Sequence, residues 1–200
     1  NQAARSILDG HNVLYISLEM AEDRVAQRLD SIFTRIQQKE LSNRVDDIEE
    51  RLGIISKQWE ERGRLVIKEF PCKRLSVTAL RAYLNQLKNY EDFTPDVIVV
   101  DYLELMKTEN DMAEYAGQER LAQELRGAAS EYGCLVWTAT QTNREGKKVS
   151  IITDAELADS YGKIRVCDLV FSINQTEQEF DEGQARLYLM KSRNGRARFI

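Results

Sequence analysis

The sequence has few of the residues that build disulfide scaffolds and metal clusters. Its 200 residues include three cysteines, which are far apart and never form a C-x-x-C pair. This usage argues against a disulfide framework or a zinc ribbon, and it predicts a reducing, cytoplasmic location. The single histidine, His11, removes most Ser-His-Asp, Cys-His and His-rich metal chemistry. Catalysis would therefore depend on carboxylates, amides and cationic side chains.

Long apolar runs and proline-rich stretches are also missing. The longest apolar runs have four residues, as at 97–100, whereas a membrane span needs about 18 or more. No charged and then apolar leader opens the sequence, so we expect a soluble, unexported chain with no membrane partner. With two prolines, ten glycines and 42% hydrophobic residues, it should fold, and its length favours one compact unit.

The overall charge does not favour nucleic-acid binding. Lys and Arg number 28 and Asp and Glu number 33, which gives a net charge of −5. Proteins that bind nucleic acid with their whole surface are usually basic. Any such contact must therefore use a local basic patch.

Helical and extended segments alternate along the chain. Val25, Leu29 and Ile32, for example, recur with the period of an amphipathic helix. Strands separated by helices are typical of an α/β fold whose mainly parallel sheet is covered on both faces, and the last two strands read as a hairpin joined by a short acidic loop. The predicted helices are 1–9, 21–38, 44–61, one capped by Ser76, and 114–132; the predicted strands are 12–18, 65–70, 97–103, 134–140, 168–174 and 185–191.

Three predicted strands end in a polar residue that is suited to catalysis. Glu19, Asp101 and Gln141 each follow an apolar run, and in open parallel sheets the active crevice lies outside the carboxyl ends of the strands. One carboxylate could activate water, another could hold a metal through its water shell, and an amide could sense a phosphate. The alternative is that these strands simply leave the core through polar residues.

Asp101 has the sharpest motif of the three. Four apolar residues followed by Asp form the Walker B pattern, in which a buried strand fixes a carboxylate beside nucleotide-bound magnesium. The usual partner, the phosphate-binding loop G-x-x-x-x-G-K-[ST], is absent. The two Gly-Lys pairs begin at Gly146 and Gly162, and neither has the required earlier glycine. No G-x-G occurs either, which excludes a dinucleotide fingerprint.

Four short motifs carry a family resemblance. They are SLEM at 17–20, DYLELM at 101–106, TQTNREG at 140–146 and KSRNG at 191–195. Their order and spacing resemble the RecA-like motor domain of DnaB-type replicative helicases over nearly the whole chain. The resemblance implies a RecA-like P-loop NTPase core for residues 1–200. A fifth segment, 157–168, resembles the family loosely, because several acidic family positions are changed.

The resemblance implies a role for each strand-end residue. Glu19 would polarise the attacking water, Asp101 would be the Walker B residue at magnesium, and Gln141 would be the sensor of the γ-phosphate. Lys191 and Arg193 resemble the family's paired cations that reach into a neighbouring subunit's ATP site. An arginine that acts in this way is worth about 10³ to 10⁵ in rate. The simpler alternative for this pair is a solvated basic turn.

Arg144, Lys147 and Lys148 follow Gln141 where the family contacts the backbone of single-stranded DNA. Cations that read phosphates suit binding without sequence preference, and a ring of subunits would repeat each weak contact. The alternative is a loop with three solvated charges.

The family also has a strand and a phosphate-binding loop immediately before a helix that resembles residues 1–9. The sequence is therefore expected to begin just downstream of the Walker A loop. We expect the 200-residue chain alone to bind Mg-ATP poorly and not to hydrolyse it.

The leading hypothesis is the motor domain of an ATP-dependent replicative DNA helicase. It would use ATP and Mg²⁺, act on single-stranded DNA and form a homo-oligomer, a hexameric ring by the family resemblance, with primase and a helicase loader as further candidate partners. The alternatives are a RecA-class recombinase or regulatory ATPase on DNA, and a non-catalytic assembly module.

Overall fold

The computed structural model describes residues 1–57, 63–108, 114–141, 151–153 and 161–195. They form two compact units, where length alone favoured one. Unit 1 comprises Asn1–Thr108 and Gly127–Ala139, and unit 2 comprises the described residues of Glu109–Arg126 and Thr140–Ile200. The helix α5 (Glu114–Tyr132) has the predicted bounds and contributes residues to both units.

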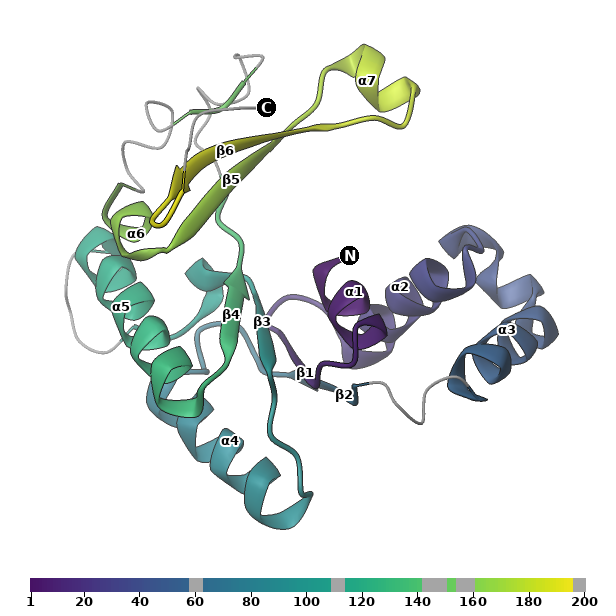
Figure 1. Cartoon of the computed structure of the whole chain (residues 1–200), viewed down its shortest axis with the longest axis horizontal. Coiled ribbons are helices and arrows are strands. Elements are labelled where there is room, and N and C mark those ends of the chain that lie inside the picture. Colours follow the sequence, from purple (N-terminus) through teal and green to yellow (C-terminus); the bar gives the residue numbers. More distant parts are fainter. Residues whose placement is uncertain (58–62, 109–113, 142–150, 154–160, 196–200) are drawn as a thin grey trace. The chain divides into compact units, whose positions relative to one another are not determined.

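Unit 1 is built on a sheet of four parallel strands in the order β2-β1-β3-β4 (Figure 1). Val13 of β1 pairs with Leu65 of β2 and with Val97 of β3, and Val97 pairs with Leu135 of β4. All four carboxyl ends therefore lie at one edge, as the alternation of strands and helices predicted. The strands are β1 (Val13–Ser17), β2 (Leu65–Glu69), β3 (Val97–Asp101) and β4 (Leu135–Thr138).

Apolar side chains cover both faces of this sheet. On one face, Val13 and Val97 pack with buried residues of α1 (Gln2–Leu8) and α2 (Glu22–Thr34), including Val25 and Leu29 of the predicted stripe. Strand residues that point to the other face are fully buried too, and α4 (Val77–Tyr90) lies on that side (Figure 1). Removing this apolar surface from water contributes about 25 cal/mol per Å² to folding. The buried side chains of the second face include Leu14, Ile16, Ile98, Val100, Leu80 and Leu84.

The helix α4 begins at the predicted cap. Ser76 Oγ accepts a hydrogen bond from the Ala79 amide at 3.1 Å, which satisfies one of the free amides of the first turn. The last turn of α5 is bound to α4, because Arg81 pairs with Glu131 at 2.8 Å and the Tyr132 hydroxyl lies 3.1 Å from Asn85 Oδ1.

The helix predicted over 21–38 is shorter than expected. It ends at Thr34, because Arg35 adopts a left-handed conformation with φ of 57°, and the Thr34 hydroxyl donates to the Asp30 carbonyl at 2.7 Å. Ile36 is buried beyond the helix end rather than on its stripe. A short 3-10 helix, η1 (Gln38–Asn43), then leads to α3 (Val45–Lys57).

In unit 2 the strands β5 (Leu169–Asn174) and β6 (Arg186–Ser192) form an antiparallel ribbon, which confirms the predicted C-terminal strand pair. The acidic connection between them is a helix, α7 (Glu177–Asp181), closed by a capping box of Thr176 and Glu179. A further short helix, α6 (Tyr161–Val166), precedes β5 and was not predicted.

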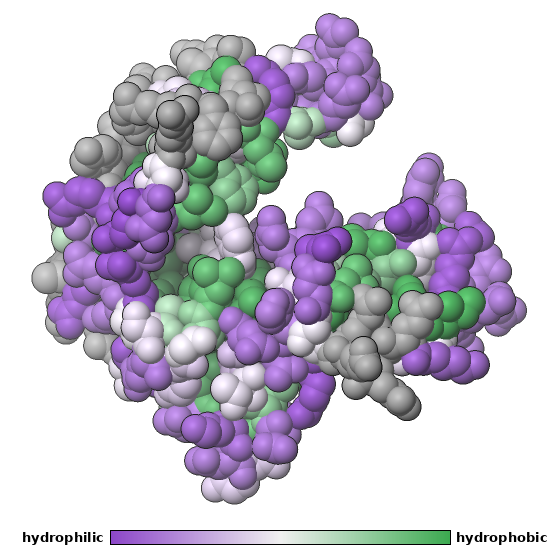
Figure 2. Space-filling view, in the orientation of Figure 1, coloured by the Kyte–Doolittle hydropathy of each residue, from purple (hydrophilic) through white to green (hydrophobic). Residues whose placement is uncertain are grey.

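The ribbon exposes apolar side chains, which Figure 2 shows in green. Leu169, Ile173 and Leu187 keep 46%, 66% and 57% of their surface exposed. None of the helices in the described part of the chain has the length and apolar character that a bilayer span demands.

Candidate active site

Glu19 and Asp101 lie at the carboxyl ends of two neighbouring parallel strands. Ser17, the last residue of β1, pairs with Asp101, and the Leu18 amide donates to the Asp101 carbonyl at 3.0 Å. Glu19 follows at once, exposed, in the turn that leads to α2. The structure therefore brings these two predicted residues to the same edge of unit 1.

The serine of the SLEM motif builds the turn that presents Glu19. Ser17 is buried, and its hydroxyl accepts from the Met20 amide at 3.1 Å and donates to the Met20 carbonyl at 2.6 Å. A hydroxyl can donate and accept at once, so one side chain closes the turn from both sides. Glu19 is thereby directed to solvent at the strand end.

Asp101 is half-buried, and Tyr15 holds one of its oxygens. The Tyr15 hydroxyl donates to Asp101 Oδ2 at 2.7 Å from the same face of the neighbouring strand. Burial, and then this hydrogen bond, raise the pKa of Tyr15 far above its usual value, although the positive charge of Arg28 acts in the opposite direction. The phenol therefore keeps its proton and remains a donor to the carboxylate at any physiological pH.

Acidic charge gathers at this edge. Desolvation, and then the carboxylates of Glu19 and Glu104, raise the pKa of Tyr102, to which Asp101 adds a smaller effect. Within the described ranges, no three His, Cys, Asp or Glu side chains are grouped as a metal site. The edge therefore suits a cation such as Mg²⁺, which binds one or two carboxylates and takes its other ligands from water and phosphate.

Gln141 lies three residues beyond β4, the other neighbour of β3, and its side chain is exposed. It belongs to unit 2. The residue before it, Thr140, accepts a hydrogen bond from Lys163 of α6 at 3.0 Å, and the same ammonium donates to Gln118 of α5 at 2.8 Å. Lys163 is only 7% exposed.

Lys191 and Arg193, at the end of β6, lie together on the last turn of α6. Lys191 Nζ donates to the carbonyls of Ile164 and Arg165 at 2.9 and 2.6 Å. Arg193 donates to the Val166 carbonyl at 3.3 Å. Desolvation, and then the charge of Arg193, lower the pKa of Lys191.

Asp168 fixes the guanidinium of Arg193. Arg193 Nε lies 2.5 Å from Asp168 Oδ1, and the Arg193 amide donates to the Asp168 carbonyl at 2.9 Å. Arg126 of α5 binds both oxygens of the same carboxylate, at 3.0 and 3.2 Å. A paired arginine fork of this kind gives geometric definition as well as energy.

Sequence reasoning missed both Lys163 and Asp168 as site residues. The signal that could have found them is the stretch 157–168, which resembled the family loosely and contains both. The other basic residues predicted to contact DNA, Arg144, Lys147 and Lys148, lie outside the described residues.

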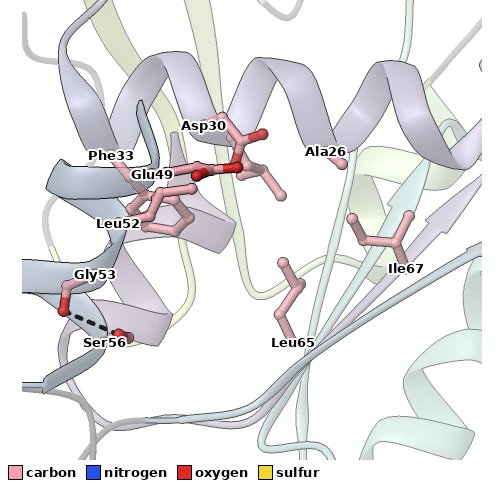
Figure 3. A pocket seen from close by; sticks show the side chains of 10 residues that line it. Ala26, Asp30, Phe33, Glu49, Leu52, Gly53, Ser56, Leu65 and Ile67 are labelled. Atoms are coloured by element: carbon pink, nitrogen blue, oxygen red, sulfur yellow. Dashed lines mark hydrogen bonds between the residues drawn. The ribbon is translucent and has the colours of Figure 1, made fainter. Parts of the chain in front are cut away.

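A separate apolar cavity of about 470 Å³ lies between α2, α3 and β2 (Figure 3). Its lining includes Leu65 and Ile67, from the amino-terminal half of β2, so it does not open at the carboxyl ends of the strands. Asp30 and Glu49 lie close to each other at this cavity in Figure 3, and burial raises the pKa of Asp30. None of the predicted site residues lines it.

The whole sequence, residues 1–200, matches the family described as the DnaB-like helicase C-terminal domain. The chain belongs to this family. It is 32% identical over 196 residues to the DnaB-like replicative helicase of Enterobacteria phage T4, a match that covers 93% of this chain and 40% of that protein. It is 26% identical over 204 residues to a protein of Trieres chinensis named "Probable replicative DNA helicase", covering 92% of this chain and 42% of the relative.

Solved structures of DnaB-like proteins share the fold. One of them, described as an ATPase domain, superposes with a TM-score of 0.77 at 17% identity, over 98% of this chain and 72% of that one. A structure of a DnaB-like replicative helicase, described with its interactions with primase, gives 0.77 at 16% identity, over 98% and 49%. These matches confirm the predicted RecA-like fold class. The chain spans about 40% of the length of the two curated relatives.

Proposed function

We propose that this chain is the motor domain of an ATP-driven replicative DNA helicase that couples ATP hydrolysis at subunit interfaces to movement on single-stranded DNA and duplex unwinding. The observation that carries the proposal is the pair of carboxylates, Glu19 and Asp101, at the ends of adjacent parallel strands. Membership of the DnaB-like helicase family gives that pair its context.

Asp101 would hold Mg²⁺ through its water shell, and Glu19 would polarise the water that attacks the γ-phosphate of ATP. The magnesium ion, when bound with ATP, supplies neutralisation of the phosphate charge. The residues fit this group because Asp101 is half-buried and oriented by Tyr15, while Glu19 is exposed and directed outward by the Ser17 turn. Gln141 would sense the γ-phosphate from the end of the next strand.

Lys191 and Arg193 would act on the ATP of a neighbouring subunit. Arg193 keeps 43% of its side chain exposed, although it is held by Asp168, so its guanidinium can be offered outward without losing its support. A cation that arrives from a neighbour makes hydrolysis depend on assembly. This part of the proposal therefore requires a homo-oligomer, and the family resemblance implies a hexameric ring.

Arg144, Lys147 and Lys148 would bind the phosphates of single-stranded DNA in the cytoplasm, where primase and a helicase loader are further candidate partners. A local basic segment is consistent with binding by a chain whose net charge is −5. Because such contacts release counterions, binding should weaken steeply as salt rises.

The test is ATP hydrolysis by the product of the complete reading frame that contains this sequence, with and without single-stranded DNA. We expect DNA to stimulate turnover and Arg193→Ala to lower it by about 10³ or more. Arg120→Ala is the matched control, because Arg120 is similarly exposed in unit 2 and pairs only with the nearby Glu124 at 2.9 Å among the interactions described. It should retain turnover.

Three outcomes separate the hypotheses. DNA-stimulated turnover together with strand displacement supports the helicase. Turnover without strand displacement favours a recombinase or regulatory ATPase. No turnover, despite a phosphate-binding loop in the complete reading frame, favours a non-catalytic assembly module.

A further inference from the structure

Lys163 is a buried lysine that connects two segments of unit 2. Its ammonium donates to Gln118 of α5 and to Thr140, the residue before Gln141. A charged amine in a site that is only 7% exposed is costly unless it is hydrogen-bonded. These bonds therefore fix the position of α6 relative to Thr140.

Close packing of α6 on α5 makes this connection possible. Gly162 lies beside Glu119, and a Cβ at Gly162 would stand 3.2 Å from the Glu119 Cβ. The absence of a side chain lets the two helices approach closely enough for Lys163 to reach Gln118. Arg165, on the outer side of α6, adds a 2.9 Å ion pair to Glu119.

The other end of α6 holds the cationic pair. The last carbonyls of a helix have no partner within the helix and attract positive charge. In α6 those of Ile164 and Arg165 accept from Lys191, and that of Val166 accepts from Arg193. One six-residue helix, about 9 Å long, is thus bonded at one position to Thr140 and at its end to Lys191 and Arg193.

We propose that Lys163 is a positioning residue that makes α6 a coupling element between the strand-end segment of Gln141 and the cationic pair Lys191 and Arg193. The inference rests on the proposed function, because it assigns a purpose to residues whose roles are proposed there. When Thr140 shifts as Gln141 meets a γ-phosphate or DNA, the bond to Lys163 moves α6, and the carbonyls of α6 move the two cations. Packed elements transmit such shifts as discrete rearrangements.

A purely structural lysine would behave differently in a kinetic test. Its loss would lower stability, and it would lower turnover with and without DNA by the same factor. Loss of a coupling residue lowers the stimulation by DNA and leaves the KM for ATP unchanged. The ratio of turnover with DNA to turnover without DNA is therefore the quantity to measure.

The experiment uses the complete protein with Lys163→Met, which removes the ammonium and keeps an unbranched side chain. We expect the stimulation ratio to fall about tenfold, with KM for ATP within twofold of the wild type. Arg165→Met is the matched control, because it removes a cation from the same helix, at a side chain that is 67% exposed and is not bonded to Thr140 in the structure. It should retain the wild-type ratio.

Thr140→Val is the second variant, because it deletes the acceptor of Lys163 with little change of shape. It should lower the ratio as Lys163→Met does, and the double variant should be no worse than the more severe single variant, as expected for two residues that share one interaction. Additive losses in the double variant would overturn the inference.

The inference and the proposed function fail in distinguishable ways. If Arg193→Ala abolishes turnover while Lys163→Met and Thr140→Val keep the wild-type ratio, the coupling inference is wrong and the proposed function stands. If the wild-type protein itself shows no turnover, both are wrong.

Discussion

The hydrogen bond from Tyr15 to Asp101 determines how the strand-end carboxylate is presented. The hydroxyl occupies Oδ2 at 2.7 Å, and the raised pKa of Tyr15, caused first by burial and then by this bond, keeps the donor proton in place. A carboxylate held from one side loses rotational freedom before any cation binds. Tyr15 therefore belongs to the site even though it would not touch a substrate.

Replacing Tyr15 by Phe should weaken both folding and activity. We expect the free energy of unfolding to fall by about 1 to 2 kcal/mol, because the lost hydrogen bond has a charged acceptor. ATP turnover of the complete protein should fall as well, because Asp101 becomes free to rotate. Urea denaturation and steady-state kinetics measure the two effects.

Tyr83→Phe is the control for this substitution. Tyr83 is also partly buried in unit 1, but it packs edge-on against Phe70, with 5.7 Å between ring centroids, and no hydrogen bond from it to a carboxylate is described. It should change turnover little. Equal losses of turnover in both variants would contradict the role given to Tyr15.

The difference between Asp101 and Tyr15 also marks how far sequence reasoning reaches at this scale. Four apolar residues followed by Asp identify the carboxylate, because strand ends carry chemistry in parallel sheets. The partner depends on register, which puts Tyr15 on the same face as Asp101 across the strand pair. Register arises from the packing of whole strands, so no local pattern around Tyr15 indicates it. The same holds for Lys163, whose partners are 23 and 45 positions away.

At the scale of elements, α3 depends on its intrinsic helix propensity more than its neighbours do. None of its residues is buried, and Gly53 lies in its interior beside the cavity of Figure 3. A Cβ at Gly53 would meet no atom within 4 Å. Gly53→Ala should therefore raise the free energy of unfolding by about 0.5 to 1 kcal/mol, since Ala restricts the unfolded chain and favours the helix.

Urea denaturation followed by far-ultraviolet circular dichroism checks this expectation. Ser56→Ala tests whether any gain belongs to Gly53 alone, because Ser56 lines the same cavity and its hydroxyl donates to the Gly53 carbonyl at 3.0 Å. A loss of stability in Gly53→Ala would mean that the glycine is required by its surroundings.

The first turn of α2 is joined to the end of β2 by a pH-sensitive contact. Glu22 accepts from the Glu69 amide at 3.0 Å and from Lys68 Nζ at 3.2 Å. The amide bond first, and then Lys68, lower the pKa of Glu22 below its usual 4.5. A carboxyl group with a lowered pKa in the folded state adds stability above its unfolded pKa, and that stability is lost as the pH falls through the folded value.

Glu22→Gln should therefore be less stable than the wild type at pH 7, and the difference should vanish as the pH falls below the usual value of 4.5. Denaturation series at several pH values measure it. Asp23→Asn is the control, because Asp23 lies in the same helical turn and its described bond is to the adjacent Arg24 amide at 2.9 Å. A difference for Glu22→Gln that persists unchanged in acid would contradict this account.

Sequence patterns predicted the elements that bury a continuous stripe and missed those that do not. The apolar stripes of α2, α4 and α5 and the strands β1 to β6 were recognisable by period. The short helix α6 has no such stripe and is fixed by Lys163 and by the cations on its last turn. The helix α7 did have a readable signal, the spacing of Thr176 and Glu179 in a capping box, which was read as a loop.

At the scale of the whole molecule, the proposed catalytic groups are divided between the two units. Glu19 and Asp101 belong to unit 1, whereas Gln141, Lys191 and Arg193 belong to unit 2. Within unit 2 the cations are supported by α6 and Asp168. Each unit thus presents a complete local arrangement, which is the organisation that a site shared between subunits requires.

Mixing two inactive variants tests such sharing directly. Asp101→Asn should inactivate the subunit that binds Mg-ATP, and Arg193→Ala should inactivate its neighbour's contribution. In an equal mixture that assembles at random, about one interface in four combines an intact Asp101 with an intact Arg193. We therefore expect the co-assembled mixture to recover up to about a quarter of wild-type turnover without DNA, whereas each variant alone recovers none. The control is the same pair mixed without subunit exchange, and a co-assembled mixture no more active than that control would show that Arg193 acts within its own subunit or not at all.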